Sequence, residues 1–157
     1  MSISRKDLSR LIIQTLKDFD EYSRSALNLL LGTAAVESEM GLYLYQTHGG
    51  PARGIFQQEP KDVFDIWDRY LRYRGKLRFL VGEVTGVFNA DEKHLPGNML
   101  FQIVMARVHY RRIPFSLPRH DNIEGLAHYW KSHWNTCEGK GTVEDFISKY
   151  NKYVKGA

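Results

Sequence analysis

The chain contains almost no cysteine and no long apolar segment. Cys137 is the one cysteine among 157 residues, which excludes an intramolecular disulfide framework. The longest apolar runs, such as residues 29–31 and 34–36, are far shorter than the roughly 20 residues of a membrane-spanning helix. The first four residues are polar overall, and no secretory apolar segment follows them. We therefore expect one domain over residues 1–157, made in the cytoplasm without a signal peptide or a membrane span.

Motifs for metal, nucleotide and thiol chemistry are also missing. The sequence has no Gly-rich phosphate loop and no His-Glu-x-x-His pattern. Among six histidines, only His128 and His133 are close in sequence, and a spacing of five places them poorly for one helix face. Nothing local supports pairing Cys137 with a histidine in a thiol hydrolase. We expect neither a metal nor a cofactor.

The charge balance is modestly basic. The formal net charge is +4 and the isoelectric point is about 9.2. Such an excess favours polyanionic partners, including nucleic acid and acidic cell-wall polymers, without choosing between them. The densest basic clusters fall at residues 69–78 and 107–112. We interpret them as solvated helix faces rather than a nucleic-acid groove, and expect no specific nucleic-acid partner.

The apolar periodicity is mainly helical and strand signals are few, which predicts an all-α or α-rich fold. A loop of four glycines and one proline spans residues 41–58, with room for a short hairpin. Residues 86–97 also read as loop. The segment 98–112 is apolar on two sides, which is typical of a central helix. The predicted helices cover 4–19, 24–40, a segment beginning at Pro60, 77–84, 98–112, 122–134 and 143–154.

One carboxylate lies on an otherwise apolar helix face. Leu27, Leu30, Ala34 and Glu37 are spaced three or four apart, so they share one side of the second helix. Glu39 lies roughly 200° further around, where we expect solvent. A carboxylate that faces an apolar interior should have a raised pKa and retain a proton near neutral pH. Glu37 therefore has the property that a general acid requires.

Polar and aromatic residues follow Glu37. Ser38 can bond near the carboxylate, or equally its own backbone. Gln57 offers a donor and an acceptor that suit sugar amides and hydroxyls, or that stabilise its loop. Aromatic residues can stack on sugar rings, although at helical spacing they are more often core, so we assign a sugar role to one or two. These aromatics are Tyr43, Tyr45, Phe56, Trp67 and Trp130.

The order of these residues resembles the soluble lytic transglycosylase and goose-type lysozyme superfamily. Members typically show a Glu-Ser at a helix end, a Gly-Leu-Met-Gln turn about twenty residues later and a proline beyond it. Residues 36–38, 54–57 and Pro60 match that order, and Tyr110 and Pro114 keep the spacing of a third element, Ala-x-Tyr-Asn-x-Gly-Pro. The resemblance extends over roughly residues 25 to 115. In detail it is strongest to virion-associated or lysis proteins of tailed bacteriophages.

The resemblance implies a lysozyme-like helical fold that acts on peptidoglycan. It assigns Glu37 as the catalytic acid, Gln57 as a substrate contact and Tyr110 as a hydrogen-bond partner of Glu37. Together with Gln57, we predict Ser38, Phe56 and Tyr110 as substrate-binding residues. It further implies a place in the virion, in the tail or inside, or in the host cytoplasm before lysis, with other phage tail or virion proteins as possible partners.

The chain departs from the family pattern after Tyr110 and before the Gly-Ile-Phe-Gln turn. Arg111 stands where the family usually has asparagine, residues 112–113 replace small residues, and residues 48–50 replace a serine-rich stretch. These changes alter the expected shape of the cleft. They keep open a non-enzymatic alternative, a structural phage component with the same fold.

The expected reaction is cleavage of the β-1,4 bond between N-acetylmuramic acid and N-acetylglucosamine. Glu37 would protonate the glycosidic oxygen and then deprotonate a nucleophile. In a lytic transglycosylase, as the resemblance implies, the nucleophile is the muramic acid 6-hydroxyl. In a muramidase it is water, usually positioned by a second carboxylate, for which Glu59 and Asp91 are the candidates. The lack of a clear second carboxylate favours the transglycosylase.

Overall fold

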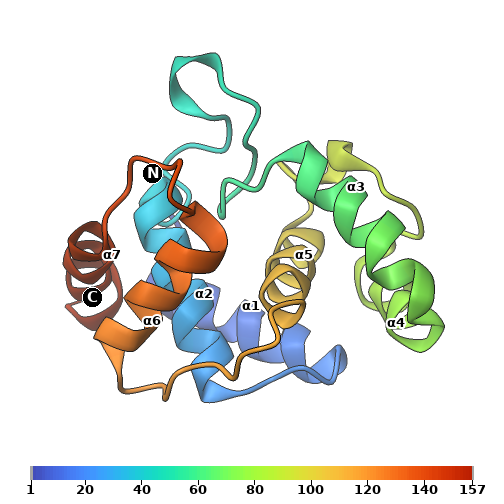
Figure 1. Ribbon diagram of the computed structural model, residues 1–157, viewed down its shortest axis with the longest axis horizontal. Coiled ribbons are helices and arrows are strands. Elements are labelled where there is room, and N and C mark those ends of the chain that lie inside the picture. Colours follow the sequence, from blue (N-terminus) through green and yellow to red (C-terminus); the bar gives the residue numbers. More distant parts are fainter. Residues whose placement is uncertain (1, 157) are drawn as a thin grey trace.

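The computed structural model describes residues 2–156, which form seven α-helices and no β-sheet (Figure 1). The predicted all-α class is confirmed. Helices α6 and α7 each continue into a wider π-type turn, at Lys131–Asn135 and Asn151–Lys155. The helices are α1 (Arg5–Asp18), α2 (Arg24–Ser38), α3 (Pro60–Arg69), α4 (Gly75–Thr85), α5 (Met99–Arg111), α6 (Ile123–Trp130) and α7 (Val143–Tyr150).

Side-chain caps fix where most of the helices begin. The hydroxyl of Ser4 accepts a hydrogen bond from the backbone N–H of Asp7, as its predicted capping role requires. Thr142 forms a reciprocal capping box with Asp145 at the start of α7. Pro60 occupies the first turn of α3, where its missing N–H is not needed. The predicted starts of these three helices are confirmed.

Helix α2 ends at Ser38, two residues before the predicted end. Three successive residues beyond it take the left-handed conformation: Glu39 (φ 51°), Met40 (φ 64°) and Gly41 (φ 84°). Only glycine adopts this conformation without steric cost, so the sequence indicated Gly41 alone. The Met40 side chain is fully buried, which offsets part of that cost. The reversal directs the chain from the end of α2 into the loop of residues 41–58.

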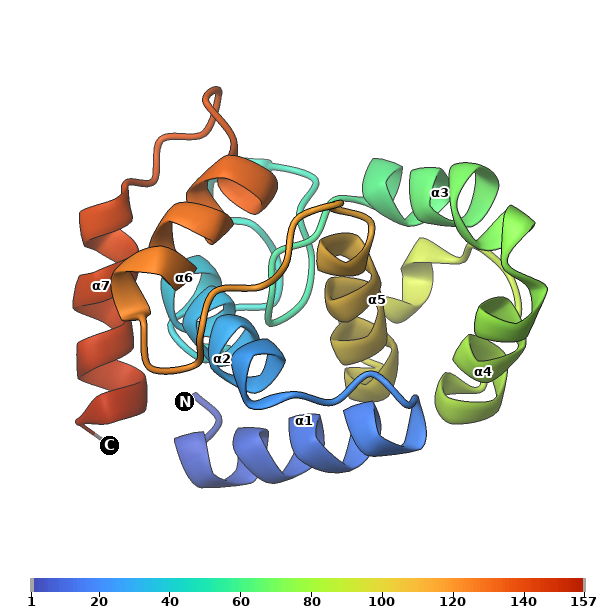
Figure 2. The same ribbon diagram turned by 60° about the horizontal axis from the view of Figure 1, so that its bottom comes forward.

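Helix α5 separates two hydrophobic cores. Its Ile103, Ala106 and Tyr110 pack with α1, α2, α6 and α7, while Phe101 and Val108 pack with α3 and α4. Figures 1 and 2 show α5 between these two groups of helices, with α1 running beneath. The prediction of a central helix with two apolar faces is confirmed.

The loop of residues 41–58 rises above the helices (Figure 1). The expected hairpin is reduced to two isolated bridges, Tyr45 with Arg53 and Arg53 with Gln58. Gly54 has a φ of 81°, and a β-carbon there would stand 2.4 Å from the Leu95 carbonyl oxygen. Glycine is therefore required where the loop passes close to the α3–α5 side. None of the helices within residues 2–156 has the length and apolarity to cross a membrane.

Candidate active site

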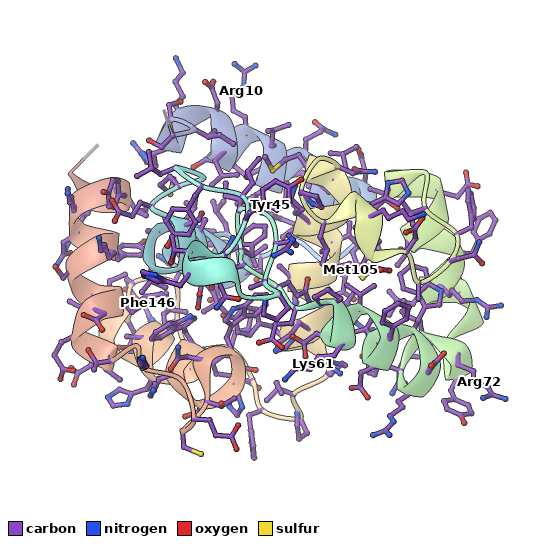
Figure 3. The ribbon with its side chains drawn as sticks, turned by 90° about the horizontal axis from the view of Figure 1, so that it is seen from above. Arg10, Tyr45, Lys61, Arg72, Met105 and Phe146 are labelled. Atoms are coloured by element: carbon purple, nitrogen blue, oxygen red, sulfur yellow. The ribbon has the colours of Figure 1, made fainter. Side chains whose placement is uncertain are left out.

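A cleft of about 730 Å³ opens where the two groups of helices meet the loop of residues 41–58. Its walls come from the end of α2, the loop, the first turn of α3, the end of α5, and the α6–α7 region. Figure 3 looks down on the loop, with Lys61 of α3 to one side and Phe146 of α7 to the other. The lining includes Glu37, Gln57, Glu59, Asp62, His109, Trp130, Trp134 and Lys149.

Glu37 lies half-buried in this cleft, one residue before the end of α2. Its carboxylate oxygen Oε1 accepts a hydrogen bond of 3.0 Å from the indole Nε1–H of Trp130. Burial raises the pKa of Glu37 from 4.5 to about 7, and the bond from Trp130 opposes that rise. A carboxyl group with this pKa holds a proton in a large fraction of molecules at neutral pH, as a general acid must.

Trp130 is fixed by its own surroundings. The side chain is 1% exposed, and its ring centroid lies 5.6 Å from that of Phe146 on α7. A β-carbon on Gly141 would stand 2.7 Å from the indole, so the segment before α7 closes against it. Trp130 was among the candidates for stacking on sugar. The structure instead buries it and directs its N–H to the Glu37 carboxylate, so for Trp130 the alternative of a core position holds.

The 139–141 segment is held in turn by Lys131. Its ammonium donates to the carbonyl oxygens of Gly139 at 3.0 Å and Gly141 at 2.6 Å, and to Asn135 Oδ1 at 2.6 Å. Three donors meeting three acceptors satisfy this ammonium fully. The cleft wall beside Trp130 is therefore ordered by one lysine.

Gln57 lines the cleft, as predicted for a substrate contact. Its Nε2 donates to the Gly54 carbonyl oxygen at 2.9 Å, and its own φ is 50°. The amide thus also stabilises the turn, which was the alternative interpretation. Its Oε1 carries no hydrogen bond to the described residues and is the atom left for a ligand.

Ser38 does not line the cleft. Its hydroxyl donates to the Ile55 carbonyl oxygen at 2.6 Å and accepts from the Gly41 N–H at 2.8 Å. The side chain is fully buried, so the predicted substrate contact is wrong. Ser38 instead ties the end of α2 to the Gly-Ile-Phe-Gln turn and fixes the position of Glu37 relative to Gln57.

Phe56 and Tyr110 also differ from prediction. Phe56 is 1% exposed within the larger core, where it cannot stack on a sugar. The Tyr110 hydroxyl lies 2.8 Å from Thr33 Oγ1, and Thr33 in turn donates to the Leu29 carbonyl oxygen. Burial raises the pKa of Tyr110 well above 10, and the nearby Glu37 charge raises it further. Tyr110 is close to Glu37, but the hydrogen bond to the carboxylate comes from Trp130.

We expected Glu39 to point into solvent, but its side chain instead contacts residues of the α7 region. Its carboxylate pairs with Lys149 Nζ at 3.0 Å and accepts a hydrogen bond from the Tyr153 hydroxyl. These contacts, with the Tyr153 bond the largest cause, lower the pKa of Glu39. The left-handed conformation of Glu39 turns its side chain toward α7, which the helical periodicity could not indicate.

Of the two predicted candidates for a second carboxylate, Glu59 lies in the cleft and Asp91 does not. Glu59 lines the cleft beside α3 and pairs with Lys61 at 3.1 Å. Asp91 lies outside the cleft, where it caps the short turn at residues 92–94. Asp62 was missed by the sequence analysis, although it follows Glu59 by three residues at a predicted helix start. It lines the cleft half-buried, and burial, followed by the charge of Glu59, raises its pKa.

Two aromatic side chains of the cleft wall were also missed. The Trp134 ring lies 4.5 Å from that of His109 and 5.2 Å from that of Tyr110. Burial lowers the pKa of His109 to about 4, so its ring is neutral, and Nε2 lies 2.9 Å from the His133 carbonyl oxygen. Trp134 follows Trp130 by four residues, a spacing that places two side chains on the same side of a helix. This spacing is the sequence signal that could have identified Trp134 as a cleft residue.

Of the departures from the family pattern, the two arginines lie outside the cleft lining and two residues of the replaced serine-rich stretch lie within it. Arg111 pairs with Glu21 at 2.5 Å and donates to the Tyr70 hydroxyl. Arg112 donates to Asp65 at 2.6 Å. Neither arginine lines the cleft, although Arg112 Nη2 also lies 3.3 Å from Nδ1 of the cleft residue His109. His48 and Gly50, from the replaced serine-rich stretch, do line the cleft.

The chain matches no protein-family model, no curated protein and no solved structure in comparisons with known proteins. Within residues 2–156, no group of three or more His, Cys, Asp or Glu side chains is arranged to hold a metal ion.

Proposed function

We propose that the protein is a peptidoglycan glycosidase that cleaves the β-1,4 bond between N-acetylmuramic acid and N-acetylglucosamine, with Glu37 as its single catalytic acid. The observation that carries the proposal is the Glu37 carboxyl group, which faces an open cleft with a pKa of about 7. The helix-end position of Glu37 and the glutamine turn facing it support a lysozyme-like active site, as the sequence resemblance implies.

The proposed reaction uses the Glu37 carboxyl group twice. The protonated carboxyl group gives its proton to the glycosidic oxygen, and the bond from that oxygen to muramic acid C1 breaks. The resulting carboxylate then takes the proton of the muramic acid 6-hydroxyl, whose oxygen bonds to C1. The products are a 1,6-anhydromuramic acid end and a free N-acetylglucosamine hydroxyl. Glu37 is returned to its protonated form.

The environment of Glu37 favours this transglycosylase over a muramidase. The rise of its pKa comes from burial, and no second carboxylate contributes to it. A glycosidase that activates water would need such a base near the sugar. The muramidase remains the alternative because Glu59 and Asp62 line the same cleft. A non-catalytic virion component with the same fold is the second alternative.

A place in the virion, or in the host cytoplasm before lysis, belongs to the same proposal. It is supported only by the resemblance of the motif segment to phage virion-associated and lysis proteins. Mass spectrometry of purified virions tests it directly.

Product analysis separates these functions. Digestion of purified peptidoglycan should release muropeptides that end in 1,6-anhydro-N-acetylmuramic acid, which are lighter by one water than the products of hydrolysis. Reducing-end muramic acid as the sole product would establish the muramidase and direct attention to Glu59 and Asp62. A folded protein that releases no soluble product would support the structural alternative. The Glu37→Gln variant, assayed in parallel, is the blank.

A further inference from the structure

A second hollow, of about 490 Å³, lies on the α3–α4 side of the molecule and shares no residue with the catalytic cleft. Two of its walls are phenylalanines that stay largely in solvent, Phe79 at 60% and Phe88 at 58% exposure. Exposed apolar side chains that gather around a concavity are typical of a binding site. The hollow is lined by Trp67, Gly75, Arg78, Phe79, Phe88 and Asn89.

Phe88 is held in this exposed position by a glycine. A β-carbon on Gly82 would stand 2.2 Å from the Phe88 ring, so the ring packs directly against the backbone of α4. The ring thereby gains a fixed orientation while more than half of its surface remains open. An ordered aromatic surface of this kind favours contact with a ring, because little conformational entropy is lost on binding.

The segment that supplies Gly75, Arg78 and Phe79 to the hollow is rich in positive charge. Residues 69–82 contain five arginines and lysines and no aspartate or glutamate, whereas the whole chain has a net charge of +4. Arg69 is paired with Asp65, and Arg74 lies 3.8 Å from the centroid of the Tyr70 ring. Within residues 2–156, the guanidinium of Arg78 has neither an ion-pair partner nor a hydrogen-bond acceptor. Arg78 is therefore available to an anionic ligand at the hollow itself.

We propose that this hollow is a second glycan-binding site that takes a peptidoglycan strand, with aromatic walls against an amino sugar and Arg78 on a carboxylate of the attached peptide. Asn89 would bond the acetamido or hydroxyl groups. The proposal rests on the proposed function. The hollow offers one guanidinium, from Arg78, and one amide, from Asn89, between aromatic side chains. This set suits an amino sugar whose attached peptide carries one carboxylate. A polynucleotide presents a phosphate at every unit and needs a continuous cationic track.

The hollow is not an extension of the cleft. Asp62 lines the cleft and Trp67 lines the hollow, and both belong to α3. Five residues along an α-helix correspond to a rotation of about 500°, so these side chains lie roughly 140° apart around the axis. One strand is therefore cut while a neighbouring strand of the same network is held. The second contact keeps the enzyme on an insoluble substrate between cuts.

Binding should be measured in a Glu37→Gln background, so that the polymer stays intact. The probe is purified sacculi stripped of phosphate-bearing polymers, with bound protein determined by sedimentation. Adding Arg78→Gln and Phe79→Ser should raise the apparent Kd by about tenfold, the equivalent of one lost anchoring contact. Arg10→Gln with Phe115→Ser is the matched control, because Phe115 is also exposed and both residues lie outside either concavity. Thermal melts should coincide for all variants.

Equal binding by the double variant and its parent would overturn the proposal. It is also overturned if the parent fails to sediment with stripped sacculi, if binding requires the phosphate-bearing polymers, or if a single-stranded oligonucleotide competes more strongly than soluble glycan strands. Product release by the wild-type protein is measured separately. An absence of product with the binding difference intact would defeat the catalytic proposal and leave this site standing.

Discussion

Glu37 and Glu39, at the end of α2, carry the same carboxyl group, but their surroundings shift its pKa in opposite directions. Glu37 faces the cleft, with one uncharged donor and a pKa raised to about 7 by burial. Glu39, two residues later, faces α7, with Lys149 and Tyr153 as partners and a lowered pKa. The first is suited to carry a transferable proton, and the second holds two helices together as an anion.

Replacing Glu37 by glutamine should have the largest effect. The amide cannot donate the catalytic proton, and general acid catalysis contributes on the order of 10²–10⁴ in rate. The rate of product release from purified peptidoglycan should therefore fall by at least roughly 10². The unfolding temperature near pH 7 should stay the same or rise, because the variant buries no ionisable group. Activity within a few fold of wild type would falsify the site assignment.

The stability of the wild-type protein should fall as pH rises through the range in which Glu37 titrates. The folded-state pKa of about 7 lies above the unfolded value of 4.5, so the folded state binds the extra proton between these values. The associated stability is complete below about pH 4.5 and is lost as pH approaches and passes 7. The difference amounts to as much as about 3 kcal/mol. Urea unfolding of wild type and Glu37→Gln at pH 5 and pH 8 isolates it.

The same titration should set the alkaline limb of activity. Catalysis needs the protonated carboxyl group, so kcat/KM should decline above about pH 7, the pKa of Glu37. A rate that stays flat to pH 9 with soluble glycan strands would mean that another group supplies the proton.

Trp130→Phe should shift that limb rather than remove activity. The variant keeps an aromatic ring in the core but loses the N–H that bonds Glu37 Oε1 at 3.0 Å. Because this bond lowers the pKa of Glu37, its loss should raise the pKa and move the limb to higher pH. Stability should fall by about 0.5–1.5 kcal/mol at neutral pH. A limb that moves to lower pH would contradict the assigned bond.

Much of the fold could be predicted from local sequence. Ser4, Pro60 and Thr142 marked helix starts because capping depends on residues within one turn. The two faces of α5 were predicted because both follow helical periodicity. The hydrogen-bond partner of Glu37 was harder to predict. Glu37 was identified by its apolar face, but Trp130 lies 93 residues away in the chain. No local pattern specifies such a partner.

The errors at the site share a physical cause. Tyr110 was assigned to Glu37 by motif spacing, whereas the neighbouring Thr33 hydroxyl takes its hydrogen bond. The Glu39 prediction assumed that the helix continued, whereas the left-handed backbone turns that side chain toward α7. In both cases a tertiary contact competed with a local rule and won.

Gln57→Ala should reduce activity partially. The amide stabilises the turn through Gly54 and leaves Oε1 for substrate, so the change removes about 0.5–1.5 kcal/mol of binding or positioning, or roughly 2- to 12-fold in kcat/KM. Tyr110→Phe is the matched comparison. Its hydroxyl contacts Thr33 instead of Glu37, so the unfolding temperature should fall while kcat/KM stays within about twofold. A larger loss of kcat/KM in Tyr110→Phe than in Gln57→Ala would restore the family role of the tyrosine.

Glu39→Gln should have the smallest effect on activity and completes the comparison. The carboxylate links α2 to Lys149 and Tyr153, and about a third of its side-chain surface is exposed (33%), so the link contributes only about 0.2–1 kcal/mol. The unfolding temperature at pH 7 should fall by up to about 4 °C, with product release unchanged. Since folding lowers the pKa of Glu39, this difference from wild type should vanish as pH falls through the folded-state pKa. Melting curves at pH 7 and pH 3 measure it. If Glu39→Gln lost activity while its unfolding temperature stayed unchanged, Glu39 and not Glu37 would be the catalytic residue.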